Sequence, residues 1–293
     1  MRFFLLPILL LFVLSSCEKT IQLQPAQSPS KLVVEATIEN GQPPVVYLSR
    51  SLGYFSSFSP DSLAESFVHD AEVFVSDGTR THKLKEYIIR IPGNFSGFYY
   101  STDSSSLSTA ITGETGRSYS LLIRWQGREY RAATRIPQIT RRIDSLYWKP
   151  APAGNIPYKV VLMLKATDPP GLGDYVRYFT KQNTDPFYPG LNSVYDDQVI
   201  DGTTYEVQVE RGVLRNGITG EAYSFFNRGD SVVLKLCNID KATYDFWRTM
   251  EFSYASIGNP FSAPTRVMSN ISGDALGYFG GYAAQYRKIY IPQ

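Results

Sequence analysis

Short stretches in which hydrophobic and polar residues alternate recur along most of the chain. The alternation is clearest in Asp70–Asp77, where Ala71, Val73 and Val75 would share one face. A period of two residues is typical of a half-buried β-strand. Patterns of this kind predict strands over residues 31–38, 45–49, 70–77, 81–91, 97–100, 118–125, 128–134, 144–148, 158–167, 175–179, 205–209, 231–237 and 286–291.

Turn residues between these stretches predict how neighbouring strands pair. Gly41–Pro44 separates the first two strands, Asp77-Gly78 follows the third, and Gln126-Gly127 lies between two long alternating runs. Such signals between alternating segments are typical of β-hairpins. The chain is therefore expected to contain mostly antiparallel strands.

One segment has helical periodicity. Asp240 is a suitable N-cap, and Tyr244, Trp247 and Met250 follow at helical spacing, which predicts a helix near residues 241–254. The fold class is expected to be mostly all-β, with two antiparallel β-sandwich domains and this helix in the second. At the level of pattern, the first domain is similar to Ig-like and transthyretin-like modules.

The remaining segments suggest the domain boundaries. Ile136–Ile143 reads as a linker, so we expect a β-sandwich domain over 31–137 and a second β-rich domain over 138–293. Residues 51–69, 183–203 and 258–282 are rich in turn residues and are expected to be long loops, with one helical turn after Pro60 in the first.

The amino terminus predicts secretion. Residues 1–16 carry Arg2 and then an apolar run from Phe3 to Leu14, which is shorter than the about 20 residues that span a bilayer and typical of a signal peptide. Leu14-Ser15-Ser16-Cys17 resembles the lipobox of bacterial lipoproteins. The alternative is an ordinary signal peptide with a chance cysteine.

Cleavage at this motif would leave a lipidated Cys17 followed by a polar tether over residues 17–30. Several acyl chains hold a protein firmly on a membrane. Because Glu18, not Asp, follows the cysteine, we expect delivery to the outer membrane, on either its periplasmic or its exterior face. Cys237 then has no intramolecular partner and is expected to be a small buried residue in a strand.

Composition excludes several function classes. The formal net charge is +2, from 29 Lys and Arg against 27 Asp and Glu, which gives no reason to expect nucleic acid as a partner. With two Cys and two His, neither histidine at ligand spacing, we expect no metal site. His69 and His82 are expected on the surface or in loops. No cofactor motif occurs, and we expect no cofactor and no catalytic residues.

Acidic residues leave one alternative open. Asp196, Asp197 and Asp201 lie in one expected loop, where they form either a solvated acidic surface or a weak cation site. A glycan-cleaving enzyme would need two carboxylates in a cleft, and the sequence does not decide whether these residues converge.

Aromatic residues in the expected loops are the candidate binding residues. Loops on a rigid sandwich often carry binding surfaces, and aromatic side chains are enriched at interfaces. The alternative is that these rings close the ends of the sandwiches or the interface between the domains. The candidates are Tyr54, Phe55, Phe58, Phe187, Tyr188, Tyr195, Phe261, Tyr278 and Phe279.

Several segments together resemble one family. They are Cys17-Glu18-Lys19, residues 31–36, residues 41–51, residues 70–73, residues 169–171, residues 269–273 and residues 277–280. In these segments the chain resembles a Bacteroidota lipoprotein family known only as a domain of unknown function, although Asp274-Ala275 stands where members often have Gly-Gly. The resemblance implies an accessory lipoprotein beside a TonB-dependent outer-membrane receptor, and assigns no catalytic residue.

The expected function is therefore that of a non-enzymatic, outer-membrane-anchored lipoprotein. It would bind a substrate or assist a TonB-dependent transporter, its partners being the membrane, through the lipid on Cys17, and the receptor. Two alternatives remain: an enzyme acting on envelope glycans, and a structural or adhesive surface module.

Overall fold

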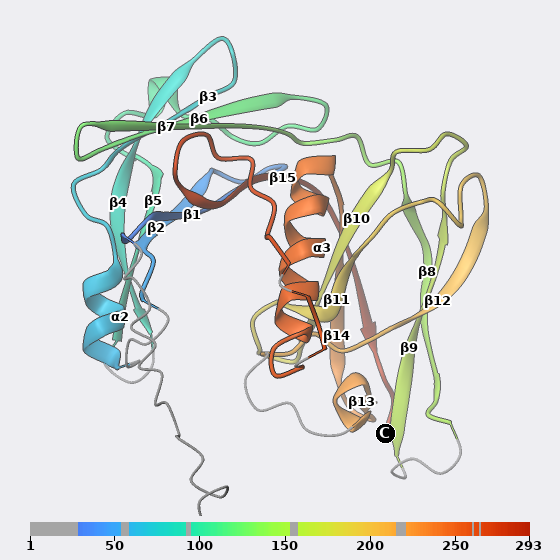
Figure 1. Cartoon of the computed structure of the whole chain (residues 1–293). Coiled ribbons are helices and arrows are strands. Elements are labelled where there is room, and N and C mark those ends of the chain that lie inside the picture. The colour runs from blue at the N-terminus through green and yellow to red at the C-terminus, as the bar shows by residue number, and fades with distance from the viewer. Residues whose placement is uncertain are drawn as a thin grey trace, which may run out of the picture.

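The structure, a computed structural model, describes residues 29–53, 59–91, 95–152, 158–214, 221–259, 261–263 and 265–293 (Figure 1). The expected signal peptide, Cys17 and most of the tether lie outside these residues. In the first half, the elements are β1 (Leu32–Glu39), β2 (Val45–Arg50), α2 (Pro60–Ser66), β3 (Glu72–Ser76), β4 (Thr81–Ile91), β5 (Phe95–Thr102), β6 (Ser118–Trp125) and β7 (Arg128–Arg135). In the second half, they are β8 (Arg142–Pro150), β9 (Lys159–Thr167), β10 (Tyr175–Gln182), β11 (Tyr188–Tyr195), β12 (Thr204–Val209), β13 (Phe226–Asn227), β14 (Ser231–Ile239), α3 (Lys241–Ala255) and β15 (Leu276–Tyr290).

The mostly-β prediction is confirmed, and so are the expected hairpins β1–β2, β3–β4 and β6–β7. Gln126 and Gly127 both have positive φ, as the tight turn between β6 and β7 requires. The helix also begins where it was predicted, because the Asp240 side chain accepts a hydrogen bond from the Thr243 amide. None of the helices in the part of the chain seen here is long and apolar enough to span a bilayer.

Most strands form one large sheet. Its order is β11-β10-β14-β15-β1-β2-β5-β4-β3-β6-β7, and β1 and β15, from opposite ends of the chain, pair in parallel. A smaller sheet contains β12, β9 and β13, with β8 paired to β9. Strands from both expected domains therefore share the large sheet.

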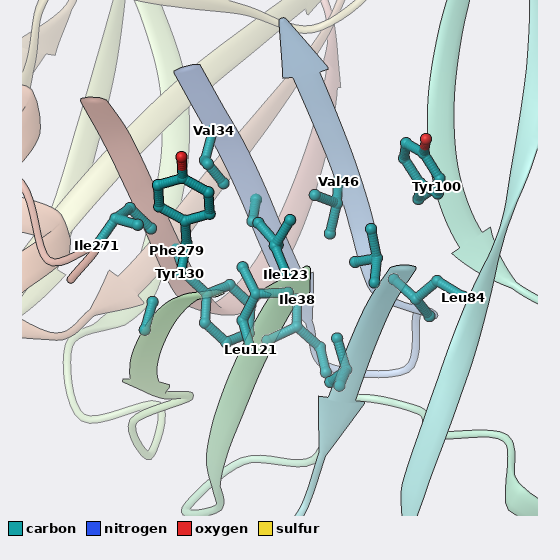
Figure 2. Close-up of a cluster of buried hydrophobic side chains, with 14 of the residues drawn as sticks. Val34, Ile38, Val46, Leu84, Tyr100, Leu121, Ile123, Tyr130, Ile271 and Phe279 are labelled. Atoms are coloured by element: carbon teal, nitrogen blue, oxygen red, sulfur yellow. The ribbon is translucent and has the colours of Figure 1, made fainter. Parts of the chain in front are cut away.

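The first hydrophobic core lies where the large sheet turns over, so that β3, β6 and β7 pack across β1 and β2. Val34 of β1 and Val46 of β2 pack in one cluster with Leu121 and Ile123 of β6. Figure 2 also shows Phe279, from the end of the chain, in this cluster. Residues beyond the expected boundary at 137 thus complete the core of the first region.

Two further hydrophobic clusters lie on the two faces of the other half of the large sheet. On the same face as the first core, Leu162 of β9 packs against Leu234 of β14, so the small sheet forms a second sandwich layer. On the opposite face, α3 lies over β10, β11 and β15, and Phe246 belongs to one buried cluster with Tyr278 and Cys237. Because successive side chains of a strand point to opposite faces of the sheet, the same strands contribute residues to two different cores.

Two expected loops contain strands. β11 lies within residues 183–203, and the first part of β15 lies within 258–282, so the loop predictions are wrong there. Each of these strands contains a glycine, a residue with low strand propensity. Neighbouring atoms leave no room for a larger side chain at these positions. A Cβ on Gly277 would lie 1.8 Å from the Val34 carbonyl oxygen, and one on Gly190 would lie 1.9 Å from the Tyr178 hydroxyl.

Candidate ligand cleft

A cleft of about 700 Å³ opens between α3, the segment that returns from α3 to β15, and the first strand. Its floor is the sheet, where Val33 and Glu35 of β1 lie beside Tyr278 of β15. Trp247 and Met250 on α3 form one wall. Strands that pair only in the folded chain thus build the floor, and the helix predicted from sequence builds the wall.

The aromatic rings of α3 fix the helix on the floor. Phe246 is stacked on Tyr278 with ring centroids 4.4 Å apart, and Trp247 meets the same ring edge-on at 5.3 Å. Offset stacking and edge-to-face contacts are the favourable geometries for aromatic pairs. The cleft wall is therefore rigidly placed.

Beneath the helix, a buried arginine ties the wall to the sheet. The Arg177 guanidinium lies 3.4 Å from the centroid of the Trp247 ring and donates hydrogen bonds to Ser193 Oγ and Tyr282 Oη, both at 3.1 Å. Glu251 on α3 accepts from the Ser193 amide at 2.9 Å and from its hydroxyl. The charge of Arg177 is thereby held in a polar and aromatic cage.

Glu35 is the carboxylate in the floor of this cleft. Its side chain is exposed to solvent, yet the walls strip away part of its hydration, and this burial raises the pKa of the Glu35 carboxyl above its usual range. The positive charge of Arg177 offsets part of that rise. Among the residues that the structure describes, Glu35 has no ion pair or side-chain hydrogen bond.

The rim of the cleft carries opposite charges. Lys31 and Asp274 form an ion pair at 2.5 Å, and Arg266 lies along the same lining. Because both partners are substantially exposed, the pair adds little to stability. Lys31 directly precedes β1, so the chain enters the fold at the rim of the cleft.

The aromatic residues singled out from the sequence are not brought together. Tyr54, Phe55 and Phe58 lie outside the described residues. Phe261 is 95% exposed, whereas Phe187 contacts the Tyr286 ring at 5.9 Å beside β11.

Four of these aromatic residues lie on strands instead of loops, because β11 and β15 extend further than propensity suggests. Tyr188 and Tyr195 belong to β11, and Tyr195 stacks on Tyr178 at 6.2 Å. Tyr278 and Phe279 are buried in β15, so their placement on a loop is wrong. Only Tyr278 lines the cleft.

The acidic segment at 196–201 holds a turn in place. Asp197 accepts hydrogen bonds from the Gly173 and Asp174 amides, at 2.7 and 2.8 Å, and Asp201 accepts from the Gly171 amide at 2.6 Å. Within the described ranges, no group of three metal-ligating side chains occurs. These carboxylates therefore have structural partners and do not face the cleft.

The remaining candidates are structural. Cys237 is buried, as expected, and burial raises the pKa of its thiol to about 12. His69 is exposed beside Glu86, but His82 is buried on β4, contrary to the surface prediction. There its Nε2 accepts the Asp103 amide hydrogen and its Nδ1 lies 2.8 Å from Thr109 Oγ1, which fixes a loop to the strand.

Sequence reasoning missed Glu35 and Trp247, the residues at the centre of the cleft. Glu35 and Glu39 are the two carboxylates at outward positions of β1, and the sequence alone gives no reason to choose Glu35 over Glu39. Trp247 was assigned to the helix but not to a site, because its surroundings come from strands far away in sequence.

Comparison with known proteins agrees with the resemblance at the level of family. No curated protein matches the chain. Residues 18–288 match the family described as a domain of unknown function (DUF4249). Because this match spans almost the entire fold, including both walls of the cleft, the chain belongs to that family.

Proposed function

We propose that this protein is a non-enzymatic, lipid-anchored binding protein of the outer membrane that holds a ligand in the α3 cleft and serves a TonB-dependent transporter. The cleft carries the proposal. Concave sites that combine apolar and aromatic walls with a few polar groups are the usual form of ligand sites. Here Trp247 and Met250 supply one wall, Tyr278 lies in the floor, and Glu35 supplies an accessible carboxylate.

The position of the cleft supports the anchored role. The segment from Cys17 to residue 30 spans at most about 50 Å when extended, since each residue covers about 3.5 Å. It joins the fold at Lys31, on the rim of the cleft. A lipid on Cys17 would therefore keep the cleft close to the membrane and to receptors embedded in it. The transporter itself comes from the resemblance to lipoproteins found beside such receptors.

The anchor and the partner are tested in one purification. The full-length chain, tagged after Gln293, is produced in a Bacteroidota host that is fed an alkyne analogue of palmitate, and outer membranes are extracted in mild detergent. We expect labelled protein and a co-purifying TonB-dependent receptor. Cys17→Ala should lose the label and leave the membrane fraction. Equal labelling of the variant, or repeated purification without any receptor, would refute the proposal.

The cleft is tested with a variant that fills it. Met250 is partly exposed on α3 and lines the cleft, so Met250→Trp adds bulk there without entering a core. We expect the variant to fold and anchor normally but to lose small molecules that native mass spectrometry detects on the wild-type protein. Leu172→Trp, at an exposed turn away from the cleft, is the control. Equal ligand occupancy in both variants would remove the cleft from the proposal.

One observation favours the rival function, an enzyme that cleaves envelope glycans. A carboxyl whose pKa is raised in a cleft can act as a general acid. The second carboxylate of the lining, Asp274, is paired with Lys31 at the rim, which makes it a poor base. Release of reducing ends from isolated envelope glycans by the wild type, lost at least about 100-fold in Glu35→Gln, would replace binding with catalysis.

A further inference from the structure

The floor of the cleft continues as a row of side chains across the open sheet. β1 pairs with β15 and β2 so that Glu35 lies between Tyr278 on one side and Tyr47 on the other. The Tyr47 ring lies 6.0 Å from that of Tyr99 on β5, which is stacked at 5.6 Å on Tyr87 of β4. We call Glu35, Tyr47, Tyr99 and Tyr87 the tyrosine row.

Beyond the cleft, the tyrosines of the row lie on the part of this face that α3 leaves uncovered. The row is on the α3 side of the sheet, but α3 packs over β10, β11 and β15 and stops short of β2. Tyr47 is 40% exposed, and Tyr99 and Tyr87 are half-buried. Ser49, two positions along β2 from Tyr47, lies on the same face and is too small to cover the rings, whereas Gly97, two positions along β5 from Tyr99, is itself buried.

The row is long and close to neutral. It spans four neighbouring strands, which makes it roughly 15 Å long in addition to the cleft, at about 4.8 Å per strand. Its one charge is the Glu35 carboxylate, and Lys85 lies two positions from Tyr87 on the same face. A polyanion would meet the carboxylate and find one cation, so the charges favour a neutral ligand.

The backbone beneath the row argues against a peptide. β1 is paired on both sides beside Glu35, and β2 and β5 pair with each other at Val45 and Val46. β4 pairs with β5 along Leu84–Ile91 but with β3 only at Thr81–Lys83, so its free edge beside Tyr87 runs along the strand and not across the row. A peptide lying across them would leave its own amides without backbone partners, and peptides usually join a sheet at an edge. Sugar hydroxyls both donate and accept, and tyrosine hydroxyls and a carboxylate can satisfy them while the C–H faces pack on the rings.

We propose that the tyrosine row, together with the α3 cleft, binds a neutral oligosaccharide that lies across the strands. One end of the chain occupies the cleft beside Glu35 and Trp247, and successive sugars pack on Tyr47, Tyr99 and Tyr87. This inference rests on the proposed binding function and names its ligand class. It requires no bond to be broken.

The test uses the full chain purified in detergent and an array of neutral oligosaccharides of one to eight sugars, with acidic glycans and unstructured peptides on the same array. The best neutral ligand is then titrated by calorimetry. Tyr47→Ala and Tyr99→Ala should each weaken its binding by about tenfold, as expected for the loss of one stacked ring. Tyr47→Phe, which keeps the ring and loses the hydroxyl, should weaken binding less than Tyr47→Ala does. Tyr290→Ala, at a more exposed tyrosine at the end of β15 and outside the row, should bind within about twofold of the wild type.

The length of the oligosaccharide gives a second test, which does not depend on whether a variant folds. Affinity should rise from one sugar to about four, because longer chains reach Tyr47, Tyr99 and Tyr87 in turn. Failure of every neutral oligosaccharide to bind, tighter binding of peptides or acidic glycans, or an unchanged affinity in both alanine variants would overturn the inference. If Met250→Trp loses the ligand but both tyrosine variants bind normally, the proposed binding site in the cleft would stand and the proposed role of the tyrosine row would be refuted.

Discussion

Glu35 lies at the boundary between two halves of one face of the large sheet. A tyrosine beside it is buried in one half and exposed to solvent in the other. On the β15 side, Tyr278 is 2% exposed, stacked under Phe246 and bonded to the Tyr282 hydroxyl. On the β2 side, Tyr47 is 40% exposed, and among the described residues its ring contact is with Tyr99. The difference comes from α3, which covers the first half and not the second. An aromatic residue on a strand is therefore core or surface according to what the rest of the chain lays over it.

The comparison predicts unequal costs for the same substitution at the two positions. Tyr278→Ala should lower the free energy of unfolding by about 3–5 kcal/mol, because it leaves a cavity under α3. Tyr47→Ala should cost about 1 kcal/mol, since it removes one exposed aromatic pair. Urea unfolding followed by circular dichroism measures both. Similar costs at the two positions would mean that the α3 half is no better packed than the open half.

A second prediction concerns the hydrogen bonds that attach the start of α3 to the sheet. Asp240 caps the helix through the Thr243 amide at 2.9 Å, and its other oxygen accepts from Thr134 Oγ1 at 2.7 Å and from the Arg135 amide at 3.1 Å. Asp240→Ala should therefore cost about 1–2 kcal/mol.

The position of that loss is as informative as its size. Hydrogen exchange should rise mainly in α3 and the segment after it, while β2, β5 and β4 keep their protection. Asp245→Ala, at a partly exposed position in the first turns of the same helix, removes the ion pair with the exposed Lys241 and serves as the control. Faster exchange over the whole sheet would show that α3 is not a separate cover.

Local patterns were sufficient for the elements that form locally. The helix, found at Lys241–Ala255, was predicted near residues 241–254 because a cap and a helical period lie within one segment. The hairpin β6–β7 was predicted because its turn and both its strands are contiguous. The parallel pairing of β1 with β15 joins opposite ends of the chain and has no local signal. The cleft depends on that pairing, so its residues could not be assembled from sequence.

The missed strand also shows why glycine-rich sequence was misread. Gly277 has a φ of +104° and lies against the Val34 carbonyl, so it marks a close approach of two backbones and not a loop. From sequence, the same residue among Gly and Asn reads as a turn. Consequently Tyr278 and Phe279 were chosen as exposed candidates, whereas the exposed Tyr47 and the half-buried Tyr99 were assigned only to strands.

The smallest predicted effect concerns Glu35 itself, at the boundary between the two halves. Its folded-state pKa lies above the ordinary value of 4.5, because burial in the cleft outweighs the attraction of Arg177. Ionisation therefore costs stability at pH values above the raised pKa, and the cost disappears below 4.5, where the carboxyl is protonated in both states. Glu35→Gln, which carries no charge, should be more stable than the wild type at neutral pH.

That gain should grow as the pH rises from 4.5 through the raised pKa and then remain constant. Urea unfolding of both proteins at pH 4 and pH 7.5 measures the difference directly, and other titrating groups cancel because they are common to the pair. Glu39→Gln provides the contrast, since Glu39 is bonded to Lys235 and Tyr286 and should lose stability at neutral pH. A destabilised Glu35→Gln at pH 7.5 would mean that Arg177 already neutralises the carboxylate, and that the cleft has no unpaired acid to offer a ligand.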